Sequence, residues 1–467
     1  CARMLRPVDH NKRPGLISRS IDVFIDGMSN FYKVSLNFVL KFRFLMLLGT
    51  IATLFISIQM FKSMPKGFFP VEDTSFLIGA SRVAPDASFE VQAEATKKVV
   101  AILLEDPAVE YVNSVAGVGG GSNRGIMFVA LKPKSVRGPI GPIIGRLRGK
   151  ASAVPGISAI FRPVQNLNLS GGRPSRSEYQ YTLQSSDIAA LYEKGPLIEE
   201  RLKAVSQLRD VDMDLEIANP QVKLEIDREK AAAFGVSAET IRQTLYNHYG
   251  SRQISTIYTQ AADYAVIMEA GGKFQDDPAA LDRIYVRGQG AGNPLVPLGQ
   301  VVKINRQVGP LTINRQSQQP SVTISFNLAP GVSLGSAVEA IQRVEAEVGL
   351  PATITSNFSG SAKLFQDSLK GQVPLILAAI LTIYIVLGVL YESFIHPITI
   401  LSGLPSAGIG ALVALQFYGM DLSVIAIIGI LMLIGIVKKN AIMMIDFAIE
   451  RRREGAKAQV AIQEAAL

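Results

Sequence analysis

Four long runs of apolar residues interrupt an otherwise mixed sequence. They cover residues 44–61, 371–391, 397–420 and 422–445, and the first three contain no charged residue. A helix needs roughly 20 apolar residues to cross a hydrocarbon layer about 30 Å thick. The pattern therefore predicts four transmembrane helices.

Residues 16–34 are too polar to cross a membrane, yet their apolar positions recur every three or four residues. Such a pattern gives a helix one apolar face, formed here by Ile17, Ile21, Phe24, Met28 and Phe31. We expect this helix to lie in the membrane interface. The alternative is a soluble helix packed on a domain.

Residues 62–370 alternate between strand-like and helix-like patterns. Their first part, 74–164, predicts the order β-α-β-β-α-β, which is the split βαβ unit. The order starts again at 178–226, is interrupted at 227–319, and resumes with strand 320–328, helix 334–349 and strand 352–358. We predict two α/β subdomains, the second carrying an insertion. Helix 359–390 should continue without a break into the second span.

Basic residues orient the chain. Residues 1–43 carry eight Lys or Arg against three Asp, and the other end contains Arg451, Arg452 and Arg453. Cytoplasmic loops of membrane proteins are enriched in Lys and Arg. Four crossings would leave both basic ends in the cytoplasm and residues 62–370 outside. A large external region suits a protein that meets its cargo outside the membrane.

Composition excludes several classes of function. Only 18% of residues are charged, and the net charge of +8 is not gathered into a basic block of the kind that binds nucleic acid. Cys1 is the only cysteine, so no disulfide forms within the chain. The three histidines, His10, His248 and His396, match no zinc-ligand spacing.

Enzyme motifs and soft-metal clusters are equally weak. One GxSxG motif occurs at 331–335, but the only histidine after it, His396, lies at the edge of a predicted span. We interpret the motif as a turn into a helix capped by Ser336 and Glu339. The external methionines are scattered: Met64, Met127, Met213 and Met268. The sequence therefore predicts neither an enzyme nor a metal site.

The strongest chemical signal interrupts the fourth apolar run, at Lys438, Lys439 and Asn440. A lysine near the middle of a bilayer costs about 2.5–3.5 kcal/mol on insertion scales, so such residues are usually paired and functional. The alternative is that a long lysine side chain reaches the cytoplasmic headgroups. Neighbours on a helix point about 100° apart, so we expect one lysine to be functional and the other to snorkel or pack. The other three runs contain no acidic partner.

Residues 115–125 read VAGVGGGSNRG, and the five glycines indicate a mobile loop between two strands. The phosphate-loop pattern and the GxGxxG spacing both fail, so nucleotide binding is unsupported. A loop beside a cargo path and an ordinary hairpin both remain open on this evidence.

Three separated motifs resemble the resistance-nodulation-division (RND) family of multidrug efflux transporters, in its hydrophobe/amphiphile exporter class. Residues 65–74, PKGFFPVEDT, resemble the segment after the family's seventh span. Residues 390–394, LYESF, resemble the end of the eighth span, and residues 435–442, GIVKKNAI, the lysine motif of the tenth. The order of the motifs makes the chain similar to the C-terminal half of such a transporter.

The resemblance implies a proton-driven antiporter of the bacterial inner membrane, working as a homotrimer or heterotrimer with a periplasmic adaptor and an outer-membrane channel. Its cargo would be amphiphilic small molecules, and no cofactor is implied. In the family the tenth-span lysine contacts two aspartates of the fourth span. Its counterpart here is Lys439, with Lys438 and Asn440 as possible contributors. The hairpin expected at 253–268 and the double lysine are most similar to the subgroup in which two related subunits share a trimer.

The glycine loop resembles the family's switch loop between two drug pockets. The candidate substrate-binding residues that this implies are Asn113, Gly117, Val118, Gly119, Gly120, Gly121 and Phe128. Asn113 and Val118 stand where the family has aromatic rings, and only Phe128 keeps the ring. A less aromatic cleft is expected to prefer other amphiphiles.

The predicted fold class is an α+β membrane protein, in which a transmembrane bundle carries a large periplasmic region. With the family's subdomain names, the order is 1–43, the cytoplasmic end of a preceding span and the interfacial helix; 44–61, a span; 62–165, a porter subdomain; 166–226, the first part of a second porter subdomain; 227–319, a funnel or docking subdomain; 320–370, the second part of the second porter subdomain; 371–391, 397–420 and 422–445, three spans; and 446–467, a truncated cytoplasmic helix.

The family's first six spans, with their aspartates, and its last two have no counterpart in this sequence, so we interpret the chain as a fragment. Two other functions stay open. One is a structural or binding subunit of a heteromeric trimer that conducts no protons. The other, less favoured, is a metal-ion exporter.

Overall fold

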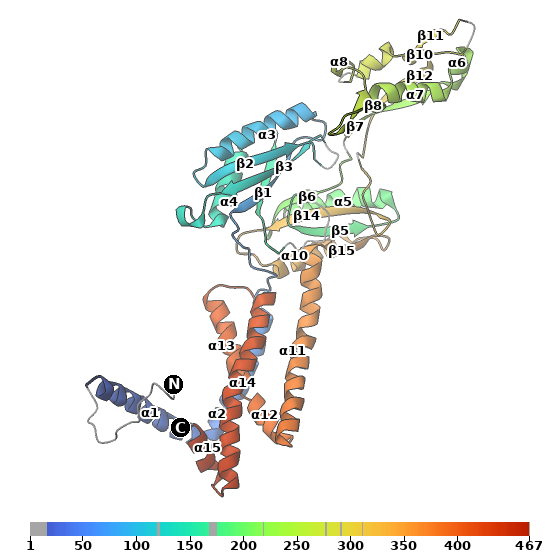
Figure 1. Cartoon of the computed structure of the whole chain (residues 1–467). Coiled ribbons are helices and arrows are strands. Elements are labelled where there is room, and N and C mark those ends of the chain that lie inside the picture. The colour runs from blue at the N-terminus through green and yellow to red at the C-terminus, as the bar shows by residue number, and fades with distance from the viewer. Residues whose placement is uncertain are drawn as a thin grey trace.

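The computed structural model describes residues 16–118, 122–167, 175–217, 219–275, 278–289, 292–310 and 312–466. Figure 1 shows an elongated molecule with a helical bundle at one end, two α/β units above it and a narrower arm beyond them. Gly119, Gly120 and Gly121 lie outside the described residues, so nothing tests their predicted role.

Apolar helices build the bundle. Its helices and their flanks are α1 (Leu16–Lys41), α2 (Arg43–Ser63), α11 (Ser361–Tyr391), α12 (Ile395–Leu401), α13 (Leu404–Phe417), α14 (Val424–Arg453) and α15 (Ala458–Ala466). Among the described residues, four stretches are long and apolar enough to cross a membrane: Arg43–Ser63, Ser361–Tyr391, Ile395–Phe417 and Val424–Arg453. The predicted apolar spans are therefore confirmed as helices of sufficient length.

The third predicted span, 397–420, is not a single helix. The chain leaves α12 at Leu401 and enters α13 at Leu404, with Pro405 in the first turn of α13. Proline has no backbone N–H to donate to the carbonyl four residues earlier, so it is tolerated at a helix start and disrupts a helix interior. The proline therefore separates α12 from α13 within one apolar stretch, Ile395–Phe417, that is long enough to cross a membrane.

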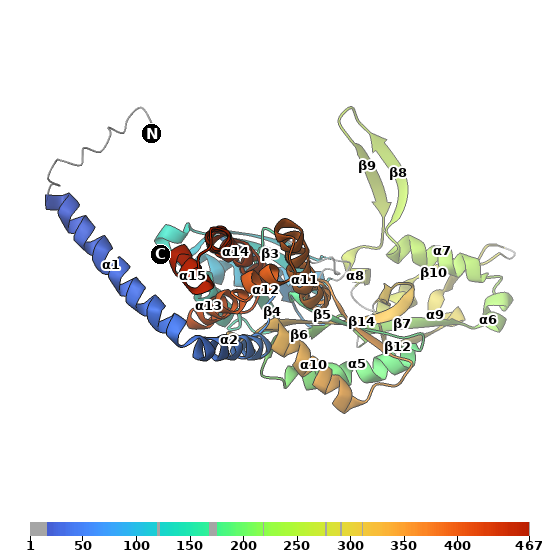
Figure 2. The same cartoon turned by 90° about the horizontal axis from the view of Figure 1, so that it is seen from below.

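The predicted amphipathic helix forms as α1 and extends beyond residue 34 to Lys41. Figure 2 shows α1 reaching sideways from the bundle, away from the other helices. Its location in the membrane interface stays a prediction.

The first α/β unit has the predicted β-α-β-β-α-β order. Its elements are β1 (Phe76–Arg82), α3 (Phe89–Leu104), β2 (Val109–Ala116), β3 (Arg124–Leu131), the 3₁₀ turn η1 (Lys134–Val136), α4 (Ile140–Ala151) and β4 (Ser158–Pro163). The strands pair in the order β2-β3-β1-β4, and every pair is antiparallel. Leu77, Met127 and Phe161 pack under the two helices. Burial alternates along β1 and β3, so the opposite face of the sheet is open.

The second α/β unit repeats this topology. Its elements are β5 (Tyr179–Gln184), α5 (Ile188–Lys203), β6 (Leu208–Met213), β13 (Arg315–Gln316), β14 (Gln319–Leu328), α10 (Leu334–Val348) and β15 (Thr355–Ser359). Strand β14 pairs with both β6 and β5, and β5 pairs with β15. The order β6-β14-β5-β15 is thus that of β2-β3-β1-β4. The cap of α10 is Ser333, whose hydroxyl accepts the N–H of Ser336 at 3.4 Å, and not Ser336 as predicted.

The insertion lies between β6 and β14. It contains β7 (Asn219–Ile226), α6 (Arg228–Ala233), α7 (Ala238–Tyr249), β8 (Arg252–Tyr258), β9 (Asp263–Met268), α8 (Gly272–Gln275), η2 (Pro278–Arg283), β10 (Tyr285–Arg287), β11 (Leu295–Pro297), α9 (Leu298–Val301) and β12 (Val302–Gly309). Its own core gathers around Val286, Leu298 and Val301. The predicted hairpin forms as β8–β9 and stands away from the rest of the chain in Figure 2.

Strand β7 forms where it was predicted but belongs to a different sheet. It pairs with β12 along its whole length, Asn219 opposite Gly309 and Ile226 opposite Val302. The chain has to leave the second unit and return to it, and the outgoing and incoming segments satisfy each other's backbone groups as an antiparallel pair. The strand therefore starts the insertion, before the boundary predicted at 226/227.

Helix α11 joins the bundle to the second unit without interruption, as predicted. Its first turns place Ala362 and Phe365 in the hydrophobic core of that unit, both at most 1% exposed. Its remaining length runs down the bundle to Tyr391, with Pro374 inside the helix. Motion of α11 along or about its axis would therefore act directly on the second unit.

Candidate transport site

Lys438, Lys439 and Asn440 lie at the middle of α14. Lys438 is 5% exposed, and its Nζ has no hydrogen-bond partner among the described residues. Lys439 and Asn440 are exposed. The two ammonium groups thus differ in environment, since neighbours on a helix point about 100° apart. Lys439 is accessible to a group from outside this bundle, whereas Lys438 is enclosed by it.

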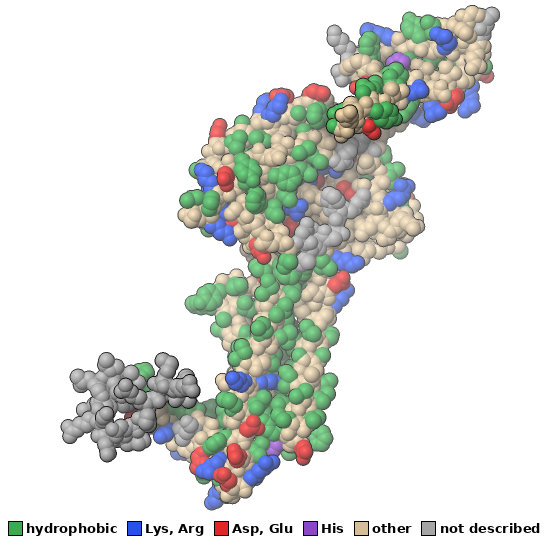
Figure 3. Space-filling view, viewed as in Figure 1, with side chains coloured by type: hydrophobic (Ala, Val, Ile, Leu, Met, Phe, Trp, Pro, Cys, Tyr) green, Lys and Arg blue, Asp and Glu red, His purple; other side chains and the backbone are tan. Residues whose placement is uncertain are grey.

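The bundle covers little of its own apolar surface. At most 17% of any candidate span is buried within the described chain, and Figure 3 shows apolar side chains spread over the outside of the bundle. Lipid or further helices would cover such a surface in a membrane. A group from a neighbouring helix therefore has room to approach Lys439.

A hydrogen bond joins α11 to α14 at the end of the bundle far from the α/β units. The Tyr391 hydroxyl donates to Asp446 Oδ1 at 2.6 Å, and the His396 ring lies 6.0 Å from the Tyr391 ring, centroid to centroid. Asp446 follows Lys439 by seven residues on α14, so both lie on one face of the helix, two turns apart. A rotation of α14 near Lys439 would therefore move Asp446 and, through the hydrogen bond, Tyr391 on α11.

Residues 65–69 connect the bundle to the second unit at its other end. Three backbone hydrogen bonds hold them: Leu422 N–H to Pro65 O at 2.9 Å, Val424 N–H to Phe68 O at 3.2 Å, and Gly335 N–H to Lys66 O at 3.0 Å. The Phe68 ring packs edge-on against Phe365, with 6.2 Å between centroids. The starts of α10 and α14 and the core end of α11 therefore meet at this segment.

Two of the predicted substrate-binding residues lie side by side on the open face of the first sheet. Asn113 on β2 is the direct cross-strand neighbour of Phe128 on β3, and both are exposed. The same sheet also exposes Phe76, Tyr111 and Val115. The face left free by α3 and α4 is therefore an apolar surface with polar positions among its rings.

Gly117 and Val118 follow directly where β2 ends. Both N–H groups donate to Arg124 O, at 2.8 and 3.3 Å. Gly117 has a φ of +75°, and a Cβ there would lie 3.2 Å from the Phe89 ring. Glycine is favoured at this position because the backbone is left-handed. These residues lie beyond the ends of β2 and β3, and Asn113 and Phe128 lie within the strands.

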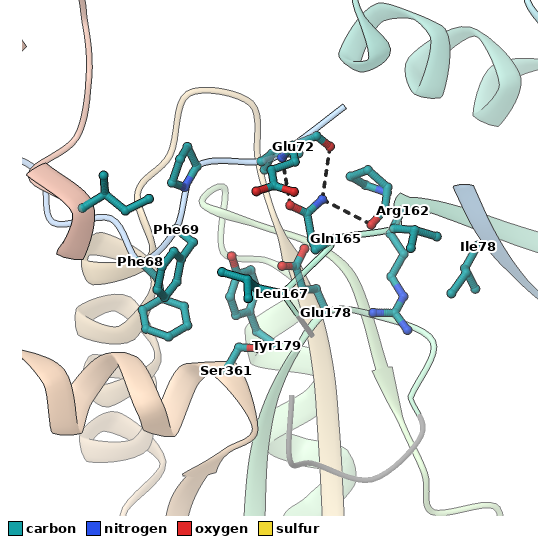
Figure 4. A pocket seen from close by; sticks show the side chains of 15 residues that line it. Phe68, Phe69, Glu72, Ile78, Arg162, Gln165, Leu167, Glu178, Tyr179 and Ser361 are labelled. Atoms are coloured by element: carbon teal, nitrogen blue, oxygen red, sulfur yellow. Dashed lines mark hydrogen bonds between the residues drawn. The ribbon is translucent and has the colours of Figure 1, made fainter. Parts of the chain in front are cut away.

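A cavity of about 130 Å³ lies where the bundle meets both units. Figure 4 shows Phe68 and Phe69 on one side, Arg162 and Ile78 on the other, and Glu178 and Tyr179 between them. Burial raises the pKa of the Glu178 carboxyl, and the charge of Arg162 opposes the shift. The sequence does not reveal this cavity, because its walls come from segments far apart in the chain.

The external methionines do not meet. Met64 lies in the core of the bundle, Met213 in the core of the second unit and Met127 in that of the first, while Met268 ends the hairpin strand β9. Within the described ranges, no group of three or more His, Cys, Asp or Glu is placed to hold a metal ion.

Comparison with known proteins places the whole sequence in one family. The model of the AcrB/AcrD/AcrF family matches residues 1–467. Multidrug resistance protein MdtC of Yersinia enterocolitica is 40% identical over 469 residues, covering 100% of this chain and 45% of the relative. MdtC of Cronobacter sakazakii is 44% identical over 427 residues, covering 91% of this chain and 41% of the relative. The chain thus spans less than half the length of these relatives.

Solved structures share the fold. Two crystal forms of a heavy metal efflux pump superpose with TM-scores of 0.76 and 0.81, at 24% and 23% identity. They cover 89% and 95% of this chain and 44% and 46% of theirs. The full-length family match and the MdtC identities show that the chain belongs to the AcrB/AcrD/AcrF family of RND transporters.

Proposed function

We propose that this chain forms part of a proton-driven transporter that exports drugs and amphiphilic compounds across the bacterial inner membrane. Its similarity to proteins named for multidrug resistance supports this function. Residues 62–370 would lie in the periplasm, with the two α/β units as porter subdomains and the insertion as a funnel. The proposal concerns the complete transporter, of which this chain is one part.

Lys439 is the proposed proton-coupled residue. Its exposed position at the middle of α14 suits an ion pair with a carboxylate of a neighbouring span, and protonation of that carboxylate would break the pair. A proton crossing the membrane releases about 2.3 kcal/mol per 100 mV. Lys438, enclosed by the bundle, would pack against its helices and add a positive charge near Lys439. Asn440 would contribute a hydrogen bond. The equilibrium between two helix arrangements would shift with each protonation.

Helix α11 would transmit the rearrangement of the spans to the region that holds the cargo. The mechanism depends on one observation, that α11 is a single helix from Ser361 to Tyr391. One end is hydrogen-bonded to α14 through Tyr391 and Asp446, and the other end is buried in the core of the second unit through Phe365. A shift of α14 relative to α11 would move the second unit against the first. Cargo held between the units would be displaced outward.

Two surfaces suit an amphiphilic cargo. The cavity of Figure 4 opens beside the outer ends of α11 and α14, where Phe68, Phe69 and Tyr179 would contact an apolar molecule. The open face that carries Phe128 and Asn113 would bind it further from the membrane, with Gly117 and Val118 at the end of the loop. Large apolar side chains combined with few polar groups are typical of small-molecule sites.

The arm is proposed to mediate assembly into a homotrimer or heterotrimer. The hairpin β8–β9 projects from the insertion and exposes Ile254, Ile257, Tyr258, Tyr264 and Ile267. Exposed large apolar side chains on such a projection suit contact with another protein. The insertion would then face a periplasmic adaptor and an outer-membrane channel.

Dye efflux from cells expressing the complete transporter tests the proposal. Lys439→Ala should abolish energy-dependent efflux of an amphiphilic cationic dye while leaving membrane insertion and trimer formation unchanged. Lys438→Ala is the matched neighbour, and Lys457→Ala, beyond the end of α14, controls for loss of a basic residue. Efflux at the wild-type level with Lys439→Ala would remove the assignment and favour a subunit that conducts no protons.

A further inference from the structure

The two α/β units have separate hydrophobic cores. One cluster contains residues of the first unit alone, such as Leu77, Val99 and Phe161. The other contains residues of the second unit together with the start of α11, such as Tyr181, Ile324 and Phe365. The units stand next to each other in Figure 1, yet neither cluster crosses between them. Their relative position therefore depends on something other than a shared apolar core.

Ion pairs connect the two units. Arg82 at the end of β1 pairs with Asp212 and, at 3.6 Å, with Glu216. Arg124 at the start of β3 pairs with Glu216 at 2.7 Å. Each arginine belongs to the first unit and each carboxylate to the second. We call the set formed by Arg82, Arg124, Arg148, Arg176, Asp210, Asp212 and Glu216 the ion-pair belt.

Two further pairs complete the belt. Arg148 in the last turn of α4 pairs with Asp210 at 2.6 Å. Arg176, from the segment that joins the units, pairs with Asp212 at 3.3 Å and also donates to Ser158 O at 3.1 Å. The belt thus ties together the ends of β1 and β3, helix α4 and the linker on one side, and the region of β6 on the other.

Local structure places the charges opposite each other. Arg82 and Arg124 are direct cross-strand neighbours on the open face of the first sheet. On the other side, the register of β6 against β14 shifts between Arg209 and Asp212, and Asp210 within this bulge has a φ of +52°. A bulge re-aims side chains along a strand. Asn327 Nδ2 holds the Asp210 carboxylate at 2.8 Å, which fixes its direction.

The carboxylates of the belt are mostly buried, its arginine side chains are 13–37% exposed, and some of its polar atoms have no hydrogen-bond partner among the described residues. The side chains of Glu216, Asp212 and Asp210 are 7%, 11% and 14% exposed. Glu216 Oε2 and the Nε atoms of Arg148 and Arg176 are buried without a hydrogen-bond partner in the described chain. Removing charges from water is costly, and a pair recovers that cost only when its remaining hydrogen-bonding positions are filled. Opening the belt would therefore let water hydrogen-bond to the Glu216, Arg148 and Arg176 atoms that have no partner when the belt is closed.

A cavity of about 870 Å³ lies at the belt, and the walls of this cavity include Arg82, Arg148, Asp212 and Glu216. Its other walls come from both units, among them Ile160 of β4 and Met213 of β6. The cavity is already open to solvent, so separation of the units would widen it and closure of the belt would narrow it.

We propose that the ion-pair belt is a reversible electrostatic latch between the two α/β units. It closes by pairing the four arginines with the three carboxylates and releases as these groups take up water, while each unit keeps its own core. The latch is a property of the chain's geometry, and measuring the positions of the units does not require that transport occurs.

Distance measurements between spin labels in the complete transporter test the latch. Labels at Lys97→Cys on α3 and Glu193→Cys on α5 report the separation of the units, since both side chains are 73% exposed and lie outside the belt. The natural Cys1 is replaced by Ser. The decisive variant is Glu216→Gln, which keeps the shape of the side chain but removes the charge shared by Arg82 and Arg124. Glu239→Gln, which breaks an exposed pair with Arg242 on α7, is the matched control.

Glu216→Gln should raise the population with separated units by at least about tenfold, and Arg148→Gln should act in the same direction, because each breaks a pair whose carboxylate is mostly buried. Glu239→Gln should match the wild type. Unchanged distances in both belt variants would overturn the latch.

Labelling of a buried cysteine distinguishes release from unfolding. Ala337 is fully buried in the core of the second unit, so Ala337→Cys should stay protected from maleimide in the Glu216→Gln background. Longer distances with a protected core support the latch. Longer distances with an exposed core would show that the ion pairs are part of the unit's own stability, and this result would also overturn the proposal.

Discussion

Phe365 holds the outer end of α11 in the core of the second unit, and its truncation should release that end. The side chain is 1% exposed and contacts the Phe68 ring. Burying an aromatic side chain removes roughly 150–250 Å² from water, which at about 25 cal/mol per Å² is worth roughly 4–6 kcal/mol. Measured Phe→Ala substitutions in cores cost about 3–5 kcal/mol. We therefore expect Phe365→Ala to weaken the anchoring of α11 by about 4 kcal/mol.

Cysteine labelling measures this anchoring directly. Ala362 lies one turn before Phe365 and is fully buried, so Ala362→Cys reacts with maleimide only when the start of α11 leaves the core. A change of about 1.4 kcal/mol alters an equilibrium tenfold. Phe365→Ala should therefore raise the labelling rate by about a thousandfold in a Cys1→Ser background.

Leu364→Ala is the matched control on the same helix, because Leu364 is 42% exposed. It should change the labelling rate by less than about fivefold, since exposed substitutions rarely exceed about 0.5 kcal/mol by much. A rise of less than tenfold for Phe365→Ala would refute the reasoning. The core would then not be what holds α11, and the helix could not transmit motion by the route described above.

Two further predictions concern the stability of the external units. The Asp106 carboxylate is fully buried and pairs with Arg146 at 2.7 Å and Lys150 at 3.1 Å, which holds its pKa well below the ordinary value of 3.8. The stabilisation by this carboxylate is therefore complete above about pH 4 and is lost as the pH falls toward the depressed pKa. Asp106→Asn should reduce the free energy of unfolding by about 1–2 kcal/mol at pH 7, a value discounted because the basic partners are partly exposed, and by less at pH 3. Urea denaturation measures both values, and an equal deficit at the two pH values would contradict this prediction. Gly235 has a φ of +67°, and a Cβ there would lie 2.7 Å from Gln289 O, so Gly235→Ala should destabilise the insertion by about 2–4 kcal/mol. Gly292→Ala, left-handed but with open space around it, should cost only about 1–2 kcal/mol, and comparable protease sensitivity of the two variants would argue against the clash.

Local patterns predicted most of the helices and strands because the signals that define them are local. Uncharged apolar runs located the spans, and strand-like patterns located strands such as β1 and β5. Pro405 was the available signal for the break between α12 and α13, since proline interrupts the hydrogen-bond ladder of a helix.

Pairings between distant segments were beyond the reach of such patterns. The residues of β7 read as a strand, but nothing within 219–226 specifies β12 rather than β6 as its partner. The ion-pair belt likewise pairs Arg148 with Asp210 and Arg82 with Glu216. These are ordinary charged residues in the sequence, and they meet only because the two folded units lie against each other.

The candidate site shows the same division. The motif position singled out Lys439, and the helical spacing predicted that Lys438 and Lys439 point in different directions; which of them is functional stays a prediction. The sequence could not say that Lys438 is the buried one, because that depends on which face of α14 packs against the other helices of the bundle. Likewise, Asn113 and Phe128 were predicted separately, and only the register of β2 with β3 makes them neighbours.

Proton flux through the complete transporter in liposomes is the most direct test of the central claim, that Lys439 couples protons to cargo. With cargo supplied and a pH gradient imposed, the wild type and Lys438→Ala should show cargo-dependent proton movement, reported by a pH-sensitive dye in the lumen. Lys439→Ala should show none, although cargo binding, measured separately without a gradient, is retained. Cargo-dependent proton flux at the wild-type rate in Lys439→Ala would contradict the account, whatever the variant does to resistance in cells.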